Sequence, residues 1–250
     1  MPLSDLICLK IMALVIALAC SSCGNFKAAS SNPISVPPTH LQWAQLLIKN
    51  LPLTNTSYRH KESVVTWAGW NGASRSESQT DCSGFINAWL EQKYGLTASD
   101  FECFFGTKRP LAKTYYDAVT SQNKFKQIPL IYDVQPGDFI VIKYPADNDN
   151  SRHIMLVAAA PQKYPSSNPE IEGTDQWVIT VIESSQTGHG KTDIRWQDNG
   201  TFHDGLGQGV FRIYTNDAGE PVGYTWSTFA ISDYYIQQER PLVIGRLNLR

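Results

Sequence analysis

A cysteine between small polar residues is the part of the sequence best suited to chemistry. Residues 80–85 read TDCSGF, and Asp81 is a suitable helix N-cap because its carboxylate accepts a hydrogen bond from a backbone N–H three residues later. Cys82 would then lie in the first helical turn, where the positive end of the helix dipole favours a thiolate over a thiol. Ser83 and Gly84 are small, so we expect the sulfur to be approachable from solvent. Cys82 is therefore a candidate nucleophile.

A thiolate nucleophile needs a base, and the base needs a group that orients it. His153 stands at the head of the predicted strand 154–159, after a polar loop. The next predicted strand, 177–183, ends at Glu183, and antiparallel neighbours place the end of one strand beside the start of the other. We therefore expect Glu183 to hold the imidazole by its second nitrogen. His189, a loop histidine between two glycines, is the alternative for this role.

Two kinds of periodicity describe the elements that must position these residues. Apolar residues at three- to four-residue spacing predict helices over 40–50, 81–94 and 110–123. The rest of the chain shows the pattern of strands, predicted over 139–143, 154–159, 177–183, 210–214, 224–226 and 242–244. The polar, Pro-rich segment 161–175 indicates an inserted loop. Helices followed by a largely antiparallel sheet predict an α+β architecture in one domain, residues 39–250.

The N-terminus has the features of an export signal. Residues 11–19 (IMALVIALA) are apolar, but the run is shorter than the ~20 residues that span a bilayer, which predicts a signal peptide over 1–19. Cleavage before Cys20 resembles bacterial lipoprotein processing, and Cys23 is the alternative lipidation site. The Ser-, Asn- and Pro-containing segment 20–38 predicts a flexible tether. We expect an exported protein of the periplasm or cell envelope, attached to the membrane through a lipid on Cys20.

Composition excludes several classes of protein. A net charge of −2 argues against a nucleic-acid binder, which would show a basic face. Hydrophobic residues at 42% and charged residues at 18% indicate a globular chain. Five cysteines are too few for a disulfide scaffold. Cys103, in an aromatic segment, is interpreted as a buried free thiol, with a disulfide to Cys23 as the alternative. The predicted domain has no CxxC or HExxH motif, so a metal site is not expected.

A few further side chains invite a functional interpretation. Arg109, Arg195 and Arg212 are candidates for binding substrate carboxylates, although single arginines usually lie on solvated surfaces. His60 and His203 are interpreted as surface residues. We expect a monomer.

The order of three motifs resembles the NlpC/P60 cysteine peptidases, papain-like enzymes that cut peptides of bacterial cell walls. The motifs are DCSGF (81–85), QPGDF (135–139) and HIMLV (153–157), and the resemblance covers roughly residues 60–190. NlpC/P60 members usually carry His, Asn or Gln at the third catalytic position. The related CHAP amidases often carry Glu there, as this chain does at Glu183.

The resemblance implies a fold, a reaction and a set of roles. The fold is a papain-like (NlpC/P60-type) α+β arrangement with N-terminal helices on an antiparallel sheet and a β elaboration over 190–250. The reaction is cofactor-free hydrolysis of amide bonds in cell-wall (peptidoglycan) peptides. Cys82 would attack the carbonyl to form a thioester, His153 would move the proton, and the backbone N–H of Cys82 would donate to the oxyanion. A non-catalytic wall-binding module and a cysteine acyltransferase are the alternatives.

Overall fold

The computed structural model describes residues 40–145 and 152–249. The predicted signal peptide (1–19), the tether (20–38) and both lipidation candidates, Cys20 and Cys23, lie outside the described residues. Within those residues no helix combines the length and apolar character needed to cross a bilayer.

The helices of the described chain all precede the large sheet in sequence. They are α2 (His40–Asn50), α3 (Cys82–Tyr94), α4 (Ala98–Phe105) and α5 (Ala112–Thr120), with short 3₁₀ turns at Leu53–Asn55 and Ile131–Asp133. Helices over 40–50 and 81–94 are confirmed, and the one expected over 110–123 is shorter. Helix α4 was not predicted, although a capping box between Thr97 and Asp100 marks its start.

A small sheet precedes helix α3 and leads the chain into it. It contains β1 (Thr56–Ser57), β2 (Val64–Thr66) and β3 (Glu77–Gln79), with β3 in the middle. Strand β3 ends two residues before Asp81, so the pairing of β3 with β1 and β2 fixes the point at which the helix begins.

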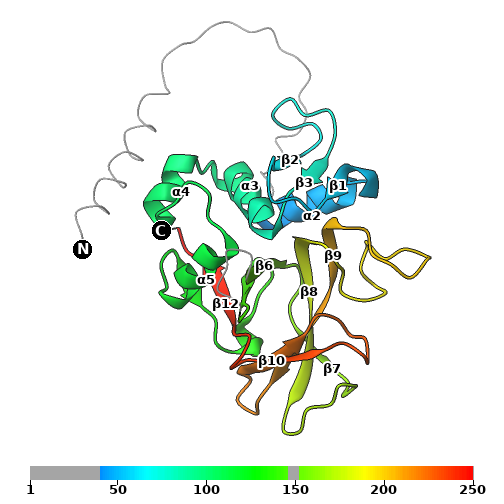
Figure 1. The fold of residues 1–250 in the computed structure, drawn as a ribbon. Coiled ribbons are helices and arrows are strands. Elements are labelled where there is room, and N and C mark those ends of the chain that lie inside the picture. The colour runs from blue at the N-terminus through cyan, green and yellow to red at the C-terminus, as the bar shows by residue number, and fades with distance from the viewer. Residues whose placement is uncertain (1–39, 146–151, 250) are drawn as a thin grey trace, which may run out of the picture. The chain divides into compact units, whose positions relative to one another are not determined.

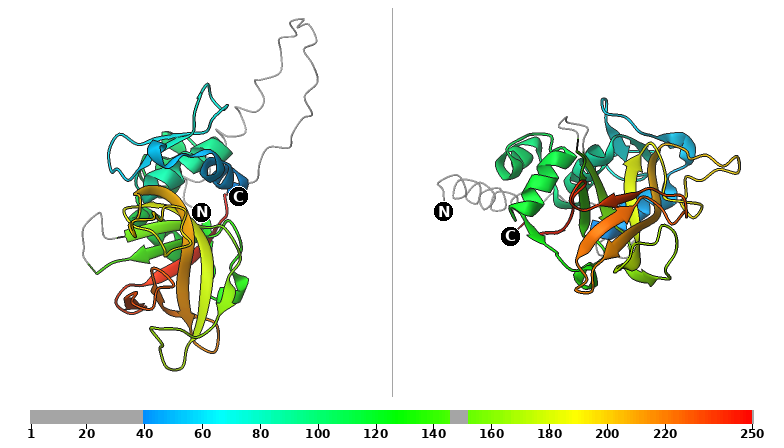
Figure 2. Two further views of the ribbon diagram at one scale, coloured as in Figure 1. Left: turned by 90° about the vertical axis from the view of Figure 1, so that its right-hand side faces the viewer. Right: turned by 60° about the horizontal axis from the view of Figure 1, so that its bottom comes forward.

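The large sheet has nine antiparallel strands within the described residues. Along the sheet the order is β11 (Tyr234–Ile236), β10 (Pro221–Thr225), β9 (Gly205–Thr215), β8 (Asp175–Ser185), β6 (Arg152–Val157), β5 (Phe139–Lys143), β12 (Leu242–Leu247) and β4 (Phe125–Gln127), while β7 (Gln162–Tyr164) pairs with β8. Every pairing in it is antiparallel. Figure 1 and the left view of Figure 2 show α2 and α3 at one end, with the long β8–β9 pair running away from them.

Both faces of the middle strands are buried, which explains their continuous apolar runs (FIVI and HIMLV). On one face, Phe139, Val141, Ile154 and Leu156 pack against residues of all four helices. On the other face, the alternate residues of β5 and β6 pack with β8, β9 and β10, the second apolar cluster of the described chain. Two cores on opposite faces of one sheet hold the ends of β6 and β8 rigidly in place.

The predicted papain-like α+β fold is wrong. The described chain is mostly β, because its nine-stranded sheet outweighs four short helices. Segment 190–250, expected to be an elaboration, supplies β9 to β12, and β9 pairs with β8 along all eleven residues of each strand. The physical reason is that β9, β10 and β12 supply residues of the second apolar core, so the sheet covers this core only when these strands belong to it.

Candidate functional site

The beginning of helix α3 is built by local side-chain hydrogen bonds. Asp81 caps the helix by accepting from the backbone N–H of Gly84 at 2.6 Å and from Ser83 Oγ at 3.0 Å. Position 84 has room only for hydrogen, because a Cβ there would lie 2.1 Å from Thr80 Oγ1. Cys82 therefore begins the helix, as the sequence predicts.

The thiol of Cys82 is free but not open to solvent. Only 5% of the residue is exposed, and it packs within the core cluster beneath the helices. The expectation that small neighbours leave the sulfur approachable is wrong, because Ser83 and Gly84 are themselves buried.

Cys82, His153 and Glu183 lie next to one another in a row. Cys82 lies near enough to the His153 ring to raise the pKa of His153, and the ring's Nε2 contacts Glu183 Oε2. Strands β6 and β8 run antiparallel with Val157 opposite Val181, so alternation places His153 and Glu183 on the same face. Since Glu183 occupies Nε2, the Nδ1 atom is left for the thiol proton.

The charges in this row favour the ionised forms of His153 and Glu183. Burial lowers the pKa of His153, but the negative charges of Glu183 and Cys82 outweigh burial and raise that pKa to about 10. Burial alone would raise the pKa of Glu183, but the nearby charges of His189, His153 and Arg195 hold it well below its usual range. Glu183 is therefore a buried carboxylate and His153 a strongly basic imidazole.

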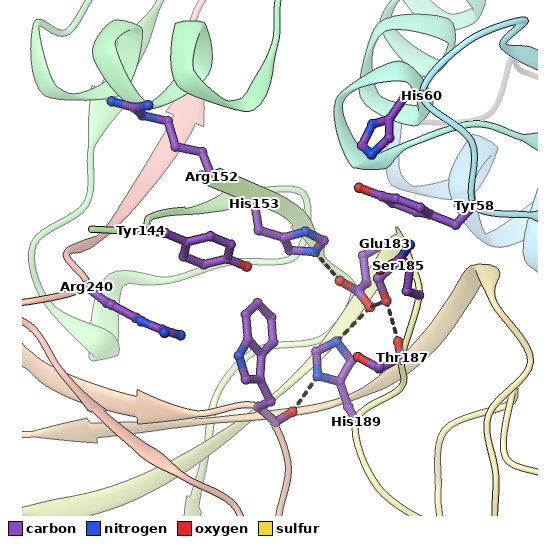
Figure 3. Close-up of a pocket in the computed structure, with 12 residues that line it drawn as sticks. Tyr58, His60, Tyr144, Arg152, His153, Glu183, Ser185, Thr187, His189 and Arg240 are labelled. Carbon is purple, nitrogen blue, oxygen red and sulfur yellow. Dashed lines mark hydrogen bonds and ion pairs between the residues drawn. The ribbon is translucent and has the colours of Figure 1, made fainter. Parts of the chain in front are cut away.

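A loop between β8 and β9 brings a second set of charges to Glu183. His189 Nε2 lies 3.0 Å from Glu183 Oε1, and Arg195 Nη2 donates to the same oxygen at 2.9 Å. Asp193 in turn accepts from Arg195 Nε at 2.9 Å and Nη2 at 2.8 Å. The sequence offered Glu183 and His189 as alternatives for orienting His153. In the structure Glu183 contacts His153 through Oε2, and His189 contacts the other carboxylate oxygen, Oε1 (Figure 3).

Alternating glycines in β9 make room for this buried ion cluster. A Cβ at Gly207 would lie 2.2 Å from Arg195 Nε, and one at Gly209 would lie 2.4 Å from Asp193 Oδ2. Gly207 is directly opposite Glu183 in the β8–β9 ladder. The GLGQG run at 205–209 is thus the feature of the sequence that leaves room for Arg195 and Asp193. The motifs alone did not indicate that these two residues belong to the site.

His153 and Glu183 line a cleft with a volume of about 540 Å³, whereas Cys82 is not among the residues that line it. Its lining includes side chains that the motifs did not single out: Tyr58, Tyr144, Arg152, Trp226 and Arg240 (Figure 3). Burial and the nearby negative charges of Cys82, Asp81 and Glu183 raise the pKa of the Tyr58 hydroxyl, which stays a hydrogen-bond donor beside the thiol. These residues come from loops and strands that only the tertiary structure brings together.

The remaining histidine and arginine candidates have varied surroundings. His60 is half exposed but lines the cleft, 3.4 Å from Asp81 Oδ2. Arg109 pairs with the same carboxylate oxygen at 3.3 Å. Arg212 is buried and bonds to Thr225 and the 167–168 loop. Arg109 and Arg212, like Arg195, are thus engaged with groups of the protein itself.

Cys103 differs from its expected state. It is exposed and disulfide-bonded, not a buried free thiol. Its partner is not Cys82, whose thiol is free. Across the described residues, no set of three or more His, Cys, Asp or Glu side chains is arranged to hold a metal ion.

Comparison with known proteins places the chain in a family without assigning it an activity. It is 36% identical over 225 residues to the uncharacterized protein R653 of Acanthamoeba polyphaga mimivirus, an alignment that covers 86% of this chain and 99% of that protein. The chain therefore belongs to the same family as the mimivirus protein. No protein-family model matches it, and no solved structure does, so the papain-like fold has no support there either.

Proposed function

We propose that this protein is a cysteine-dependent hydrolase of amide bonds. The observation that carries the proposal is the row of Cys82, His153 and Glu183, of which His153 and Glu183 line a cleft. A thiol, a base and a group that orients the base are the parts that nucleophilic catalysis by cysteine requires. All three side chains are buried, so their mutual geometry is fixed by the two cores.

The reaction proceeds in two steps through a thioester. The thiol proton already resides on His153, whose pKa is raised to about 10. The sulfur of Cys82 therefore attacks the carbonyl carbon, and the C–N bond breaks as His153 gives the proton to the leaving amine. Water then attacks the thioester with His153 as its base, and the acid leaves as Cys82 regains its proton. The backbone N–H of Cys82 and the hydroxyl of Tyr58 are donors available to the oxyanion.

Glu183 acts through His153 in this scheme. Its Oε2 atom fixes the imidazole, while Arg195 and His189 hold Oε1 and keep the carboxylate ionised. An ionised partner stabilises the imidazolium that forms when His153 takes a proton.

Peptides of bacterial cell walls are the substrates that we place first. The predicted export signal and lipid anchor would put the enzyme in the cell envelope, within reach of such peptides. The disulfide at Cys103 supports an oxidising compartment, because disulfides persist mainly outside the cytosol. The same resemblance to NlpC/P60 and CHAP enzymes that suggests the reaction also suggests this substrate.

The test compares three variants on purified cell-wall peptides, with new amines and product masses as the readout. Cys82→Ala and His153→Ala should each lower kcat about 10³-fold or more, because nucleophile and base act as one unit. Glu183→Gln should lower it less, since the amide still orients the ring. Circular dichroism checks that each variant is folded.

Three results would change this assignment. Full activity of Cys82→Ala would show that Cys82 is not the nucleophile. Equal binding to the wall by wild type and Cys82→Ala, with cleavage by neither, would assign a binding module. With an added amine acceptor, transfer products in place of hydrolysis products would assign an acyltransferase.

A further inference from the structure

Arg240 is held rigidly in the wall of the cleft. It lies in the connection between β11 and β12, and its guanidinium carbon is 4.0 Å from the ring centroid of Tyr235 and 5.4 Å from that of Tyr144. Such stacking fixes a planar cation by electrostatic attraction to the ring faces. Figure 3 shows Arg240 extending into the cleft that also contains Tyr144 and His153.

This cation has aromatic neighbours in place of a counter-ion. No carboxylate of the described chain lies within 4.0 Å of it, whereas Arg109 pairs with Asp81 and Arg195 with Glu183. A half-buried guanidinium with neutral neighbours retains its capacity to bind an anion through two parallel N–H groups.

The cleft as a whole favours negative ligands. Its lining contains two arginines and three histidines, and Glu183 is the single carboxylate among these lining residues. That carboxylate is 1% exposed and already held by His153, His189 and Arg195. The cleft is therefore rich in basic groups, although the chain as a whole has a net charge of −2.

We propose that Arg240 binds a carboxylate of the substrate, so that the site prefers amides that carry negative charge near the scissile bond. This inference rests on the proposed function, because it names the substrate class for the same cleft. The chemistry that fits is a peptide with an acidic side chain or a free terminal carboxylate. The forked guanidinium would hold that group while the carbonyl faces Cys82.

A matched pair of alkylating probes tests this without requiring turnover. The probes are the N-chloroacetyl derivatives of glutamate α-amide and of glutamine α-amide, which differ by one charge. In each, the sulfur of Cys82 forms a bond to the CH₂ carbon, the C–Cl bond breaks and chloride leaves, while the thiol proton is held by His153. Intact mass gives the rate, and peptide mapping confirms labelling of Cys82.

We expect the acidic probe to label wild type about tenfold faster than the amide probe, in line with ~1.5 kcal/mol for a charge-assisted hydrogen bond. In Arg240→Gln this ratio should fall close to one, and Arg240→Lys should give an intermediate ratio because lysine lacks the planar fork. Lys163→Gln is the control. It removes the same charge from exposed β7, outside the cleft lining, and should keep the wild-type ratio.

Two outcomes would overturn the inference: equal rates for the two probes in wild type, or an unchanged ratio in Arg240→Gln. The proposed function fails separately, through the neutral probe. If His153→Ala labels with the amide probe as fast as wild type, His153 does not activate Cys82, whatever the charge preference of the cleft.

Discussion

His189 touches the buried carboxylate from the side opposite His153. Its Nδ1 faces the carbonyl oxygen of Trp226 at 2.5 Å, and its Nε2 faces Glu183 Oε1 at 3.0 Å. Nδ1 thus faces a hydrogen-bond acceptor, whereas Nε2 contacts Glu183 without the geometry of a hydrogen bond. The charged groups around Glu183 are this ring, His153, and Arg195 with its partner Asp193. His189 is therefore a positioning residue that helps to keep Glu183 ionised.

Replacing His189 with Gln should make the site more sensitive to acid. The variant keeps a hydrogen-bond donor but loses a positive charge that depresses the pKa of Glu183, so that pKa should rise and the carboxylate should protonate at higher pH. The measurement is the rate of Cys82 alkylation by iodoacetamide between pH 4 and 8. Its acid limb should shift to higher pH, whereas the half-exposed His203→Gln control should match wild type. Identical acid limbs for His189→Gln and wild type would show that His189 is only a packing residue.

At the scale of elements, the glycines of β9 decide whether the ion cluster forms. The β8–β9 ladder aligns Gly207 with Glu183, and the absent side chain at 207 is replaced by the guanidinium of Arg195. Any side chain there must displace either the strand or the arginine, and both are fixed by neighbours. A two-residue period of glycines on one face is therefore a functional pattern in this strand.

Gly207→Ala should destabilise the fold by ~1–3 kcal/mol, the usual cost of overpacking a buried site. It should also slow Cys82 alkylation, because Arg195 would move away from Glu183. The control is Gln208→Ala on the same strand, whose side chain points to the other face and is only half buried. Urea unfolding gives stability. Equal midpoints for Gly207→Ala and wild type would contradict the packing argument.

At the scale of the whole molecule, the buried imidazole links stability to pH. The folded-state pKa of His153 is about 10, against an ordinary value of 6.5. A raised pKa means that the folded protein holds this proton more tightly than the unfolded chain does. Its contribution to stability is therefore complete below pH 6.5 and is lost as pH rises toward 10. Glu183 acts in the opposite sense, and its contribution is lost as the solution becomes acidic.

The free energy of unfolding of wild type should therefore fall between pH 6.5 and 10. Other groups titrate in this range, so the informative quantity is the difference from His153→Gln, which should show a shallower decline. Urea midpoints measured across the range test this. A His153→Gln curve parallel to wild type would mean that the imidazole is not held as a cation.

The local pieces of the site were determined by the sequence itself. Asp81 and Gly95 mark the ends of helix α3, and the cap places Cys82 in its first turn. Alternating and continuous apolar runs located β5, β6 and the middle of β8 close to their observed bounds. The turn at 216–219 joins β9 to β10, which pair as a hairpin. These features depend on hydrogen bonds and spacings within a few residues, which a sequence states directly.

The tertiary structure alone decided how the strands pair and what surrounds the row. The two-residue repeat of apolar side chains along a strand shows which residues share a face of the sheet. It does not show which other strand pairs with them. The antiparallel pairing of β8 with β9 therefore could not be inferred, nor could the arrival of Arg195 at Glu183. The burial of Cys82 depends on α3 packing into the sheet, and the cleft depends on loops distant in sequence that place Tyr58, Trp226 and Arg240 together. Contacts between distant segments are set by how two cores fill their volume, and that packing is a property of the folded chain as a whole.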